Sequence, residues 1–225
     1  VLMRIIALSA GTSDQLAWFL IVLSVISMTV GNLAAIAQKD VKRLLAFSSV
    51  AHAGYVLIGI LSLSALGYAS AVFYGLSLLI MKFTCFFIVV KASAGGRNIV
   101  IEELAGLHYR APVLALALLL ALFGLAGIPP TIGFTAKLFI FSAAMEQGLL
   151  WLVILAMLNV VISLYYYLQV LKAAYFTEPV GHPAAISVSL PSKLLAMLLI
   201  VSMLYFGIYP RQMISLAESM ARGLM

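Results

Sequence analysis

Apolar runs of membrane-crossing length, separated by short polar segments, dominate the hydropathy pattern of the chain. A helix needs roughly 20 predominantly apolar residues to cross a bilayer. The pattern predicts complete membrane helices over Leu16–Ala37, Leu44–Leu63, Ala71–Val90, Leu149–Phe176 and Pro191–Tyr209. A further apolar run, Pro112–Ala144, is also long enough to cross but is interrupted in its middle. We therefore expect an all-α, polytopic bundle of about six membrane helices, forming a single transmembrane domain over residues 1–225.

The segments between these runs are short. Val1–Ala10 has the pattern of the end of a further helix, and Ser64–Ser70 is an uncharged loop. Ile99–Leu107 is expected to form a short helix at the membrane interface. Arg211–Met225 is amphipathic, which is typical of a helix that lies in the interface.

Composition excludes most other classes of protein. Hydrophobic residues make up 65% of the chain and charged residues 9%, which rules out a water-soluble domain of this size. The single cysteine, Cys85, lies in an apolar run, so the chain has no disulfide framework. It contains no glycine-rich phosphate loop, no CxxC or HExxH metal spacing and no Ser/His/Asp arrangement. We expect neither a metal nor a cofactor nor a redox active site in this chain.

The net charge of +6 reflects membrane topology and does not indicate nucleic-acid binding. Most cations fall in loops on one side of the expected bundle: Lys39, Lys42, Arg43, Lys91, Arg97, Arg110, Lys172 and Lys193. The loops of the other side carry only Arg4, Arg211 and Arg222. By the positive-inside rule the first side is cytoplasmic and the C-terminus is outside.

The interrupted run carries the strongest functional signal. Gly127-Ile128-Pro129-Pro130 breaks the helix, because proline has no N–H and disfavours the α conformation of the residue before it. Gly133 follows within the next turn, and Lys137 one turn later. Irregular backbone at membrane depth is tolerated only where protein buries it or where it lines a wet cavity.

Lys137 is expected to be a site of ion translocation. A charged lysine at the bilayer centre costs roughly 2.5–3.5 kcal/mol on insertion scales, and a lysine held there is expected to gain and lose a proton. A broken helix with an intramembrane ionisable residue is typical of transport sites. The alternative is that Lys137 lies near a helix end and extends its amino group to the interface.

Three other polar residues lie in apolar surroundings. Lys82, in the third complete helix, is either a proton-relay site or a structural lysine bound to a carbonyl or hydroxyl. His52 follows Ser48 by one turn and is either a relay or a structural hydrogen-bonding residue. Tyr166, within Tyr165–Tyr167, either lines a hydrated path or anchors its helix at the interface.

Two stretches of the chain resemble a known family. One runs from Gly31 to Tyr55 and contains GNLAAIAQKDVKRLLAFSSVAHAGY; the other is LAGIPPTIGFTAK, from Leu125 to Lys137, followed by ISLYYYL from Ile162. They resemble the antiporter-like membrane subunits of respiratory complex I, among which the bacterial subunit N family is the most similar. Lys82 is more typical of the other antiporter-like subunits of that complex.

The resemblance implies a fold of fourteen membrane helices with two inverted five-helix repeats, each containing one broken helix. This chain matches the end of helix 8 and helices 9 to 14, and it begins without an initiator methionine, so we expect the C-terminal part of a longer protein. In such subunits the lysine of the second broken helix is protonated and released during pumping, and Lys137 occupies that place. The expected translocation residues are Lys137, Lys82, His52 and Tyr166; the expected helix break comprises Gly127, Pro129, Pro130 and Gly133.

The implied function is proton translocation in a complex I-like NADH:quinone oxidoreductase of the bacterial cytoplasmic (inner) membrane. Flavin, Fe–S clusters and quinone would belong to partner subunits, and the partners of this chain would be other membrane subunits and the lipid bilayer. Two alternatives stay open. The chain could belong to a cation/proton antiporter or membrane-bound hydrogenase, or it could be a structural scaffold whose lysines never titrate.

Overall fold

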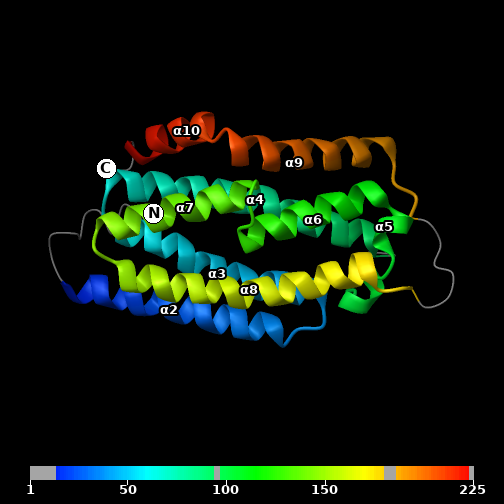
Figure 1. The fold of residues 1–225 in the computed structure, drawn as a ribbon, viewed down its shortest axis with the longest axis horizontal. Coiled ribbons are helices and arrows are strands. Elements are labelled where there is room, and N and C mark those ends of the chain that lie inside the picture. Colours follow the sequence, from blue (N-terminus) through cyan, green and yellow to red (C-terminus); the bar gives the residue numbers. More distant parts are fainter. Residues whose placement is uncertain (1–13, 94–96, 180–185, 223–225) are drawn as a thin grey trace.

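The computed structural model describes residues 14–93, 97–179 and 186–222, and every element named within them is a helix (Figure 1). In chain order they are α2 (Asp14–Ile36), α3 (Val41–Leu61), α4 (Ala65–Ala92), η2 (Ile101–Leu104), α5 (Leu107–Arg110), α6 (Pro112–Ala126), α7 (Ile132–Glu146), α8 (Leu150–Phe176), α9 (Leu190–Ile208) and α10 (Arg211–Arg222). The long helices lie roughly parallel or antiparallel to one common axis, which is horizontal in the figure.

The predicted membrane architecture is confirmed. In the described part of the chain, five helices are long and apolar enough to cross a membrane, namely α2, α3, α4, α8 and α9. The interrupted run forms the shorter helices α6 and α7, which are separated at Gly127–Thr131, one residue beyond the predicted Gly127–Pro130; Gly133, expected in the break, lies in the first turn of α7. Val1–Ala10, expected to end a further helix, lies outside the described residues.

The expected loop at Ser64–Ser70 is wrong, because α4 already begins at Ala65. Ser64 has an extended backbone, and its side chain accepts a hydrogen bond from the N–H of Gly67 at 3.0 Å, which caps the helix. Gly67 also lies so close to Ser62 and Gly59 of the preceding helix that a Cβ atom would not fit there. A cap and close packing between helices therefore extend α4 beyond its apolar run.

The expected single helix over Ile99–Leu107 is replaced by η2 and α5, with Gly106 between them at φ +66°. The start of this segment pairs with the chain just before α3. The N–H of Val41 donates to the carbonyl of Ile99 at 3.0 Å, and the N–H of Ile101 donates to the carbonyl of Lys39 at 2.9 Å. These long-range bonds hold Ile99 and Val100 extended, so a helix cannot begin before Ile101.

The expectation that Arg211–Met225 lies in the interface is also corrected. Its described part, α10, lies alongside α4 instead of across the end of the bundle (Figure 1). Met213, Ala217 and Ala221, spaced one turn apart, are buried. The apolar face that predicted membrane-surface contact is therefore covered by protein.

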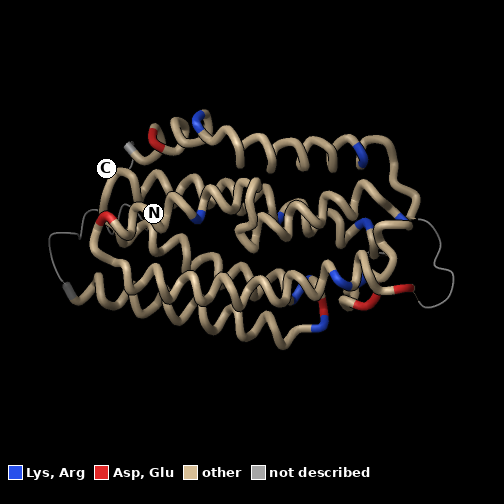
Figure 2. Tube along the Cα trace, viewed as in Figure 1, with Lys and Arg blue, Asp and Glu red and all other residues tan. Residues whose placement is uncertain are grey.

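Charged residues are segregated along the bundle axis (Figure 2). Cations gather at the end where α2, α4 and α8 finish and where α3, α6 and α9 begin. Lys82 and Lys137 are exceptions, since both are buried within helices of the bundle. Other buried polar side chains lie on α2, α3, α7 and α8: Asn32, Ser48, His52, Thr135, Asn159 and Ser163.

Candidate functional site

The break between α6 and α7 begins with a regular helix-ending motif. Gly127 adopts φ +86°, and its N–H donates to the carbonyl of Gly124 at 2.9 Å, while the N–H of Ile128 donates to the carbonyl of Phe123 at 2.9 Å. This pair of bonds is the Schellman motif, which satisfies the carbonyls three and two positions from the end of a helix. The last two carbonyls of α6, those of Leu125 and Ala126, are left in need of a donor.

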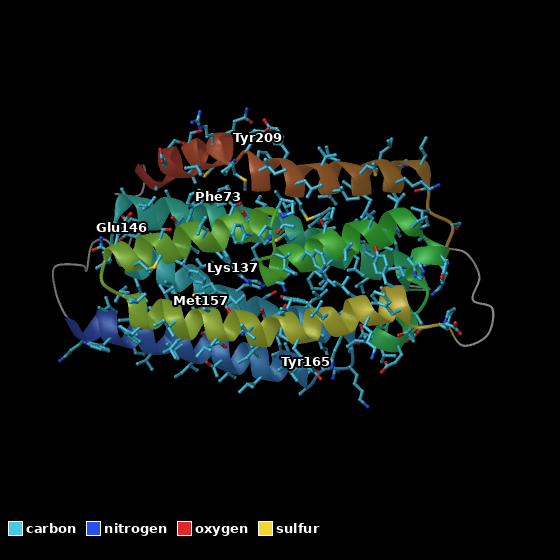
Figure 3. The ribbon with its side chains drawn as sticks, viewed as in Figure 1. Phe73, Lys137, Glu146, Met157, Tyr165 and Tyr209 are labelled. Atoms are coloured by element: carbon cyan, nitrogen blue, oxygen red, sulfur yellow. The ribbon has the colours of Figure 1, made fainter. Side chains whose placement is uncertain are left out.

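Lys137 supplies that donor. Its Nζ donates to the carbonyl of Leu125 at 2.9 Å and to the carbonyl of Ala126 at 3.0 Å. The side chain thus folds back from α7 onto the C-terminal end of α6, where the helix dipole favours a cation. Lys137 is only 5% exposed, and Figure 3 shows it well inside the bundle, whereas Glu146 lies at one end. The amino group is therefore held inside the bundle and does not extend along α7 toward its end.

Two glycines permit this geometry. A Cβ atom on Gly127 would lie 2.9 Å from Cδ and 3.2 Å from Nζ of Lys137. A Cβ atom on Gly133 would collide with the carbonyl of Gly124. Glycine at these places lets the end of α6 and the start of α7 pass close to each other, with Pro129 and Pro130 in the connecting loop.

The end of α9 packs directly against the break. The hydroxyl of Thr135 donates to the carbonyl of Gly207 at 2.8 Å. A Cβ atom on Gly207 would collide with the carbonyl of Pro130 and approach the backbone of Thr131 and Ile132. The interruption between α9 and α10 therefore lies beside the interruption between α6 and α7.

An aromatic ring separates Lys137 from the other buried polar groups. Its Nζ lies 5.3 Å from the ring centroid of Tyr55, a cation–π distance. The ring of Tyr55 is in turn 5.9 Å from the ring of His52 and 6.4 Å from the ring of Tyr74. The three rings extend from Lys137 toward the interior face of α4.

His52 has a hydrogen-bond partner on each ring nitrogen. Nδ1 lies 2.7 Å from the hydroxyl of Tyr74, and Nε2 lies 3.1 Å from the hydroxyl of Tyr167. A tyrosine hydroxyl both donates and accepts, so each partner suits either tautomer of the histidine. The side chain is 2% exposed and connects α3 with α4 and α8.

Lys82 lies on the other side of His52. Its Nζ donates to the carbonyl of Leu45 at 2.7 Å and to the hydroxyl of Ser48. Ser48 precedes His52 by one turn of α3, and its side chain also interacts with Tyr167. Lys82, Ser48, Tyr167, His52 and Tyr74 thus form one connected buried cluster, in which every hydrogen-bond partner of the lysine is uncharged.

Tyr166 occupies a different position from Tyr167. Its hydroxyl donates to Oδ1 of Asn32 at 2.9 Å, and Asn32 donates to the carbonyl and to the side-chain oxygen of Asn159 at 3.0 and 3.1 Å. Tyr166 therefore joins α8 to α2. It also interacts with Tyr167, at 4.5 Å between ring centroids, and its partner Asn32 interacts with Tyr55.

A cavity of about 770 Å³ lies between α7 and α8, and Lys137 and Gly127 form part of its wall. The other lining side chains are apolar, among them Phe134, Phe141 and Met157. The amino group of Lys137 is thus bound by backbone carbonyls, while the cavity beside the residue is lined by apolar groups.

The structure brings Lys82 and His52 into one hydrogen-bonded cluster. Lys137 lies beside this cluster, on the other side of the ring of Tyr55. Tyr166 is not part of the cluster but is the neighbour of Tyr167, which is. Sequence reasoning missed Tyr74. A usable signal was present, because Ser70, Tyr74 and Ser77 recur on one face of α4 and are all buried. Tyr167 was considered only as one of three adjacent tyrosines, and the sequence does not tell which of them faces α3.

Comparison with protein families places this geometry in context. The family described as "NADH:quinone oxidoreductase/Mrp antiporter, TM" matches residues 1–163. The chain belongs to this family. The predicted resemblance to the antiporter-like membrane subunits is thereby confirmed, and the protein is a multi-pass membrane protein.

Individual relatives agree with this assignment. The chain is 57% identical over 225 residues to NADH-quinone oxidoreductase subunit N 2 of Syntrophobacter fumaroxidans, of which it covers 48%. It superposes with a TM-score of 0.87 and 27% identity on a chain of the archaeal membrane-bound sulfane sulfur reductase, over 99% of this chain and 45% of that one. The TM-score is 0.78, at 25% identity, for a chain of respiratory complex I from Thermus thermophilus with bound NADH, over 94% and 45%. The chain spans about half the length of the curated relatives it matches.

Proposed function

We propose that this chain is the C-terminal part of a proton-translocating membrane subunit of a complex I-like NADH:quinone oxidoreductase. In this proposal Lys137 and Lys82 gain and lose protons while redox chemistry takes place in other subunits, which hold the flavin, the Fe–S clusters and the quinone. The relatives named subunit N support the type of assembly. The cation-rich end of the bundle would face the cytoplasm and the C-terminus the outside.

One observation carries the proposal: two buried lysines with only uncharged hydrogen-bond partners flank a histidine that is bonded on both ring nitrogens. Carbonyl and hydroxyl partners are also expected for a structural lysine, so the support for translocation comes from the placement of both lysines around His52. Here carbonyl and hydroxyl oxygens hold the amino groups, and these partners accept hydrogen bonds from the charged and the neutral amine alike.

The route between the lysines follows from their contacts. Lys82 and His52 share Ser48 and Tyr167, whose hydroxyls both donate and accept and so provide steps for proton transfer. Between His52 and Lys137 stands the ring of Tyr55, so a proton passing that step requires water beside the ring. A charge on either lysine interacts electrostatically with His52. Two charges roughly 7 Å apart still interact by about 2 kcal/mol at an effective dielectric constant of 20.

The test uses the full-length protein in its parent complex with Lys137→Met, which keeps most of the side-chain volume but removes the charge and the donors. Proton pumping and electron transfer are recorded in the same vesicles, and assembly is checked by gel filtration. Loss of pumping in an assembled complex is the expected result. Lys172→Met, an exposed lysine at the end of α8, is the matched control and should pump normally.

Two outcomes would overturn the proposal. If Lys137→Met pumps at the normal rate, the lysine is structural. If the complex fails to assemble with Lys137→Met but assembles and pumps with Lys137→Arg, the scaffold alternative is supported, because arginine can donate to the carbonyls of Leu125 and Ala126 but does not release a proton.

A cation/proton antiporter subunit is the second candidate, because the matching family includes Mrp antiporters as well as the oxidoreductases. It predicts translocation driven by an ion gradient without an electron donor. Vesicles of the parent assembly that acidify on NADH addition favour the oxidoreductase, and vesicles that respond only to a sodium gradient favour the antiporter.

A further inference from the structure

Helix α4 uses two pairs of adjacent residues to contact both parts of the lysine site. Tyr74 and Lys82 bind side chains of α3, where their hydrogen-bond partners lie. The residue before each of them, Phe73 or Met81, packs instead against the broken helix. Neighbouring residues on a helix point about 100° apart, so each pair reaches two different neighbours of α4. The cluster on α3 and the break are thus joined through α4 at two levels.

The thioether of Met81 lies where α6 and α7 pass each other. A Cβ atom on Gly124, in the last turn of α6, would lie 2.5 Å from Sδ of Met81. A Cβ atom on Gly133, in the first turn of α7, would lie 2.9 Å from the same sulfur. Met81 is 1% exposed. One buried atom of α4 therefore lies against both halves of the broken helix, in space that the two glycines leave open.

The contact with Gly124 falls on the motif that ends α6. The carbonyl of Gly124 accepts a hydrogen bond from the N–H of Gly127 at 2.9 Å, and the next two carbonyls along α6 are those bound by Lys137. Methionine is unbranched and polarisable, which suits a gap of irregular shape between helices. Met81 thereby fixes where the end of α6, with its bound lysine, stands relative to α4.

Lys82 follows Met81 directly in α4, so a shift at the crossing of α6 and α7 changes the position of its amino group. That group is held by the carbonyl of Leu45 at 2.7 Å and by the hydroxyl of Ser48. Transfer of a proton requires hydrogen-bond reach, roughly 2.6–3.2 Å between heavy atoms. A misplacement of about 1 Å at a reacting group can cost about 100-fold in rate. The contact at the crossing is therefore placed to control proton transfer at both lysines.

We infer that Met81 is a positioning residue, which holds Lys82 and the α6–α7 break in a fixed relative position. The thioether has no proton to give, so it acts only through the groups that it positions. The inference rests on the proposed function, because the relative position of the two lysines matters to pumping only if both of them translocate protons. It assigns a part in that function to a buried apolar side chain.

The experiment records proton pumping per assembled complex in vesicles that contain the full-length protein. Met81→Ala removes the thioether, and Gly124→Ala displaces it by placing a methyl group 2.5 Å from the present position of Sδ. In the double variant Met81→Ala/Gly124→Ala, the methyl group added to α6 occupies the space that the thioether vacates. Its next neighbour there is Cβ of Thr131 at 3.7 Å, an ordinary contact.

Each single variant should lose at least about 10-fold in pumping, because a shift of a fraction of the roughly 1 Å that costs about 100-fold is sufficient. The double variant should pump several-fold faster than either single variant, since two changes at one contact are not additive. Met81→Leu keeps most of the volume and should pump at nearly the wild-type rate. If Met81→Ala does not assemble, Gly124→Ala, which keeps every atom of Met81, shows the same loss.

Met28→Ala is the matched control. Met28 is also fully buried and packs against a helical glycine, Gly54 of α3, outside the crossing of α6 and α7. The same atoms are removed from the core, so this variant should lose stability in the same way as Met81→Ala. Per assembled complex, however, it should pump at nearly the wild-type rate.

Two results would overturn the inference. Equal pumping in Met81→Ala and Met28→Ala would show that Met81 only fills the core. A double variant that pumps no better than Met81→Ala would show that the contact with Gly124 does not position the site. Failure of the proposed function is a separate result, because Lys137→Met would then pump normally. Loss of pumping in Lys137→Met with normal pumping in Met81→Ala would remove the inference and leave the proposed function in place.

Discussion

Lys137 donates a hydrogen bond to the main-chain carbonyl of Leu125 at 2.9 Å, so a side chain of α7 completes the end of α6. The Schellman motif at Gly127 accounts for the carbonyls of Phe123 and Gly124, and the lysine accounts for the next two. The same interaction that stabilises the break therefore fixes the position of the amino group. A lysine held by backbone dipoles can lose its proton without leaving a buried carboxylate unpaired.

Gly127→Ala is expected to destabilise the protein and displace Lys137. A non-glycine residue at φ +86° costs roughly 1–2 kcal/mol, and the new Cβ atom, 2.9 Å from Cδ of Lys137, adds overpacking of about 1–3 kcal/mol. Thermal unfolding in detergent, together with pumping in vesicles, measures both effects.

Gly148→Ala is the matched control for that prediction. Gly148 also has a left-handed backbone, at φ +74°, but a Cβ atom there would meet nothing within 4 Å. It should show only the backbone penalty and retain pumping. Equal losses of stability and of pumping in the two variants would show that contact with Lys137 contributes nothing.

Gly207→Ala tests whether α9 supports the break. Its Cβ atom would collide with the carbonyl of Pro130, and overpacking of this kind costs about 1–3 kcal/mol. Gly75→Ala, where a Cβ atom meets nothing within 4 Å in the middle of α4, should be neutral or stabilising by up to about 1 kcal/mol. Melting temperatures of the two variants give the comparison, and a Gly207→Ala protein as stable as Gly75→Ala would contradict the packing.

The helix break was predictable because its cause is local. Proline and glycine act on their own backbone and on their immediate neighbours, so Gly127, Pro129 and Pro130 marked the interruption without knowledge of the rest of the fold. The start of α4 was missed for the opposite reason. Ser64 and Gly67 look like loop residues until their contacts with each other and with α3 are known.

The site was predictable only in part. Lysines and a histidine in apolar helices are conspicuous, because burying them requires a partner or a function. A tyrosine gives no such signal, because tyrosines in a membrane protein are usually interpreted as anchors at the membrane interface. Adjacent residues on a helix point about 100° apart, so choosing Tyr166 or Tyr167 required the orientation of α8 relative to α3, which depends on packing along its whole length.

The Arg97–Glu103 ion pair at the cation-rich end predicts a small dependence of stability on pH. The hydrogen bond from Arg97 holds the pKa of the Glu103 carboxyl below its usual value. A lowered folded-state pKa gives stability that is present above the ordinary glutamate pKa, about 4.3, and that is lost as the pH falls through the folded-state pKa.

The side chains of Arg97 and Glu103 are 57% and 33% exposed, so the effect is screened by solvent and salt. Unfolding curves of the wild type and of Glu103→Gln between pH 7 and about pH 3 should converge at the acidic end. Curves that stay parallel over this range would show that the ion pair does not contribute to folding.

Tyr167→Phe and Tyr166→Phe separate proton relay from structure on neighbouring residues. The hydroxyl of Tyr167 lies 3.1 Å from Nε2 of His52, whereas that of Tyr166 donates to Oδ1 of Asn32. Tyr166→Phe loses its hydrogen bond to Asn32, and Tyr167→Phe loses the bond to His52 and the interaction with Ser48. At about 1 kcal/mol for each buried hydrogen bond, the loss of stability should be equal or somewhat larger in Tyr167→Phe. Pumping in the full-length assembly should fall about five-fold more in Tyr167→Phe, because only that variant removes a group that can pass a proton to His52. If Tyr166→Phe pumps as poorly as Tyr167→Phe, the path includes Asn32 and the face of α2, and the cluster around His52 would not be the route between the lysines.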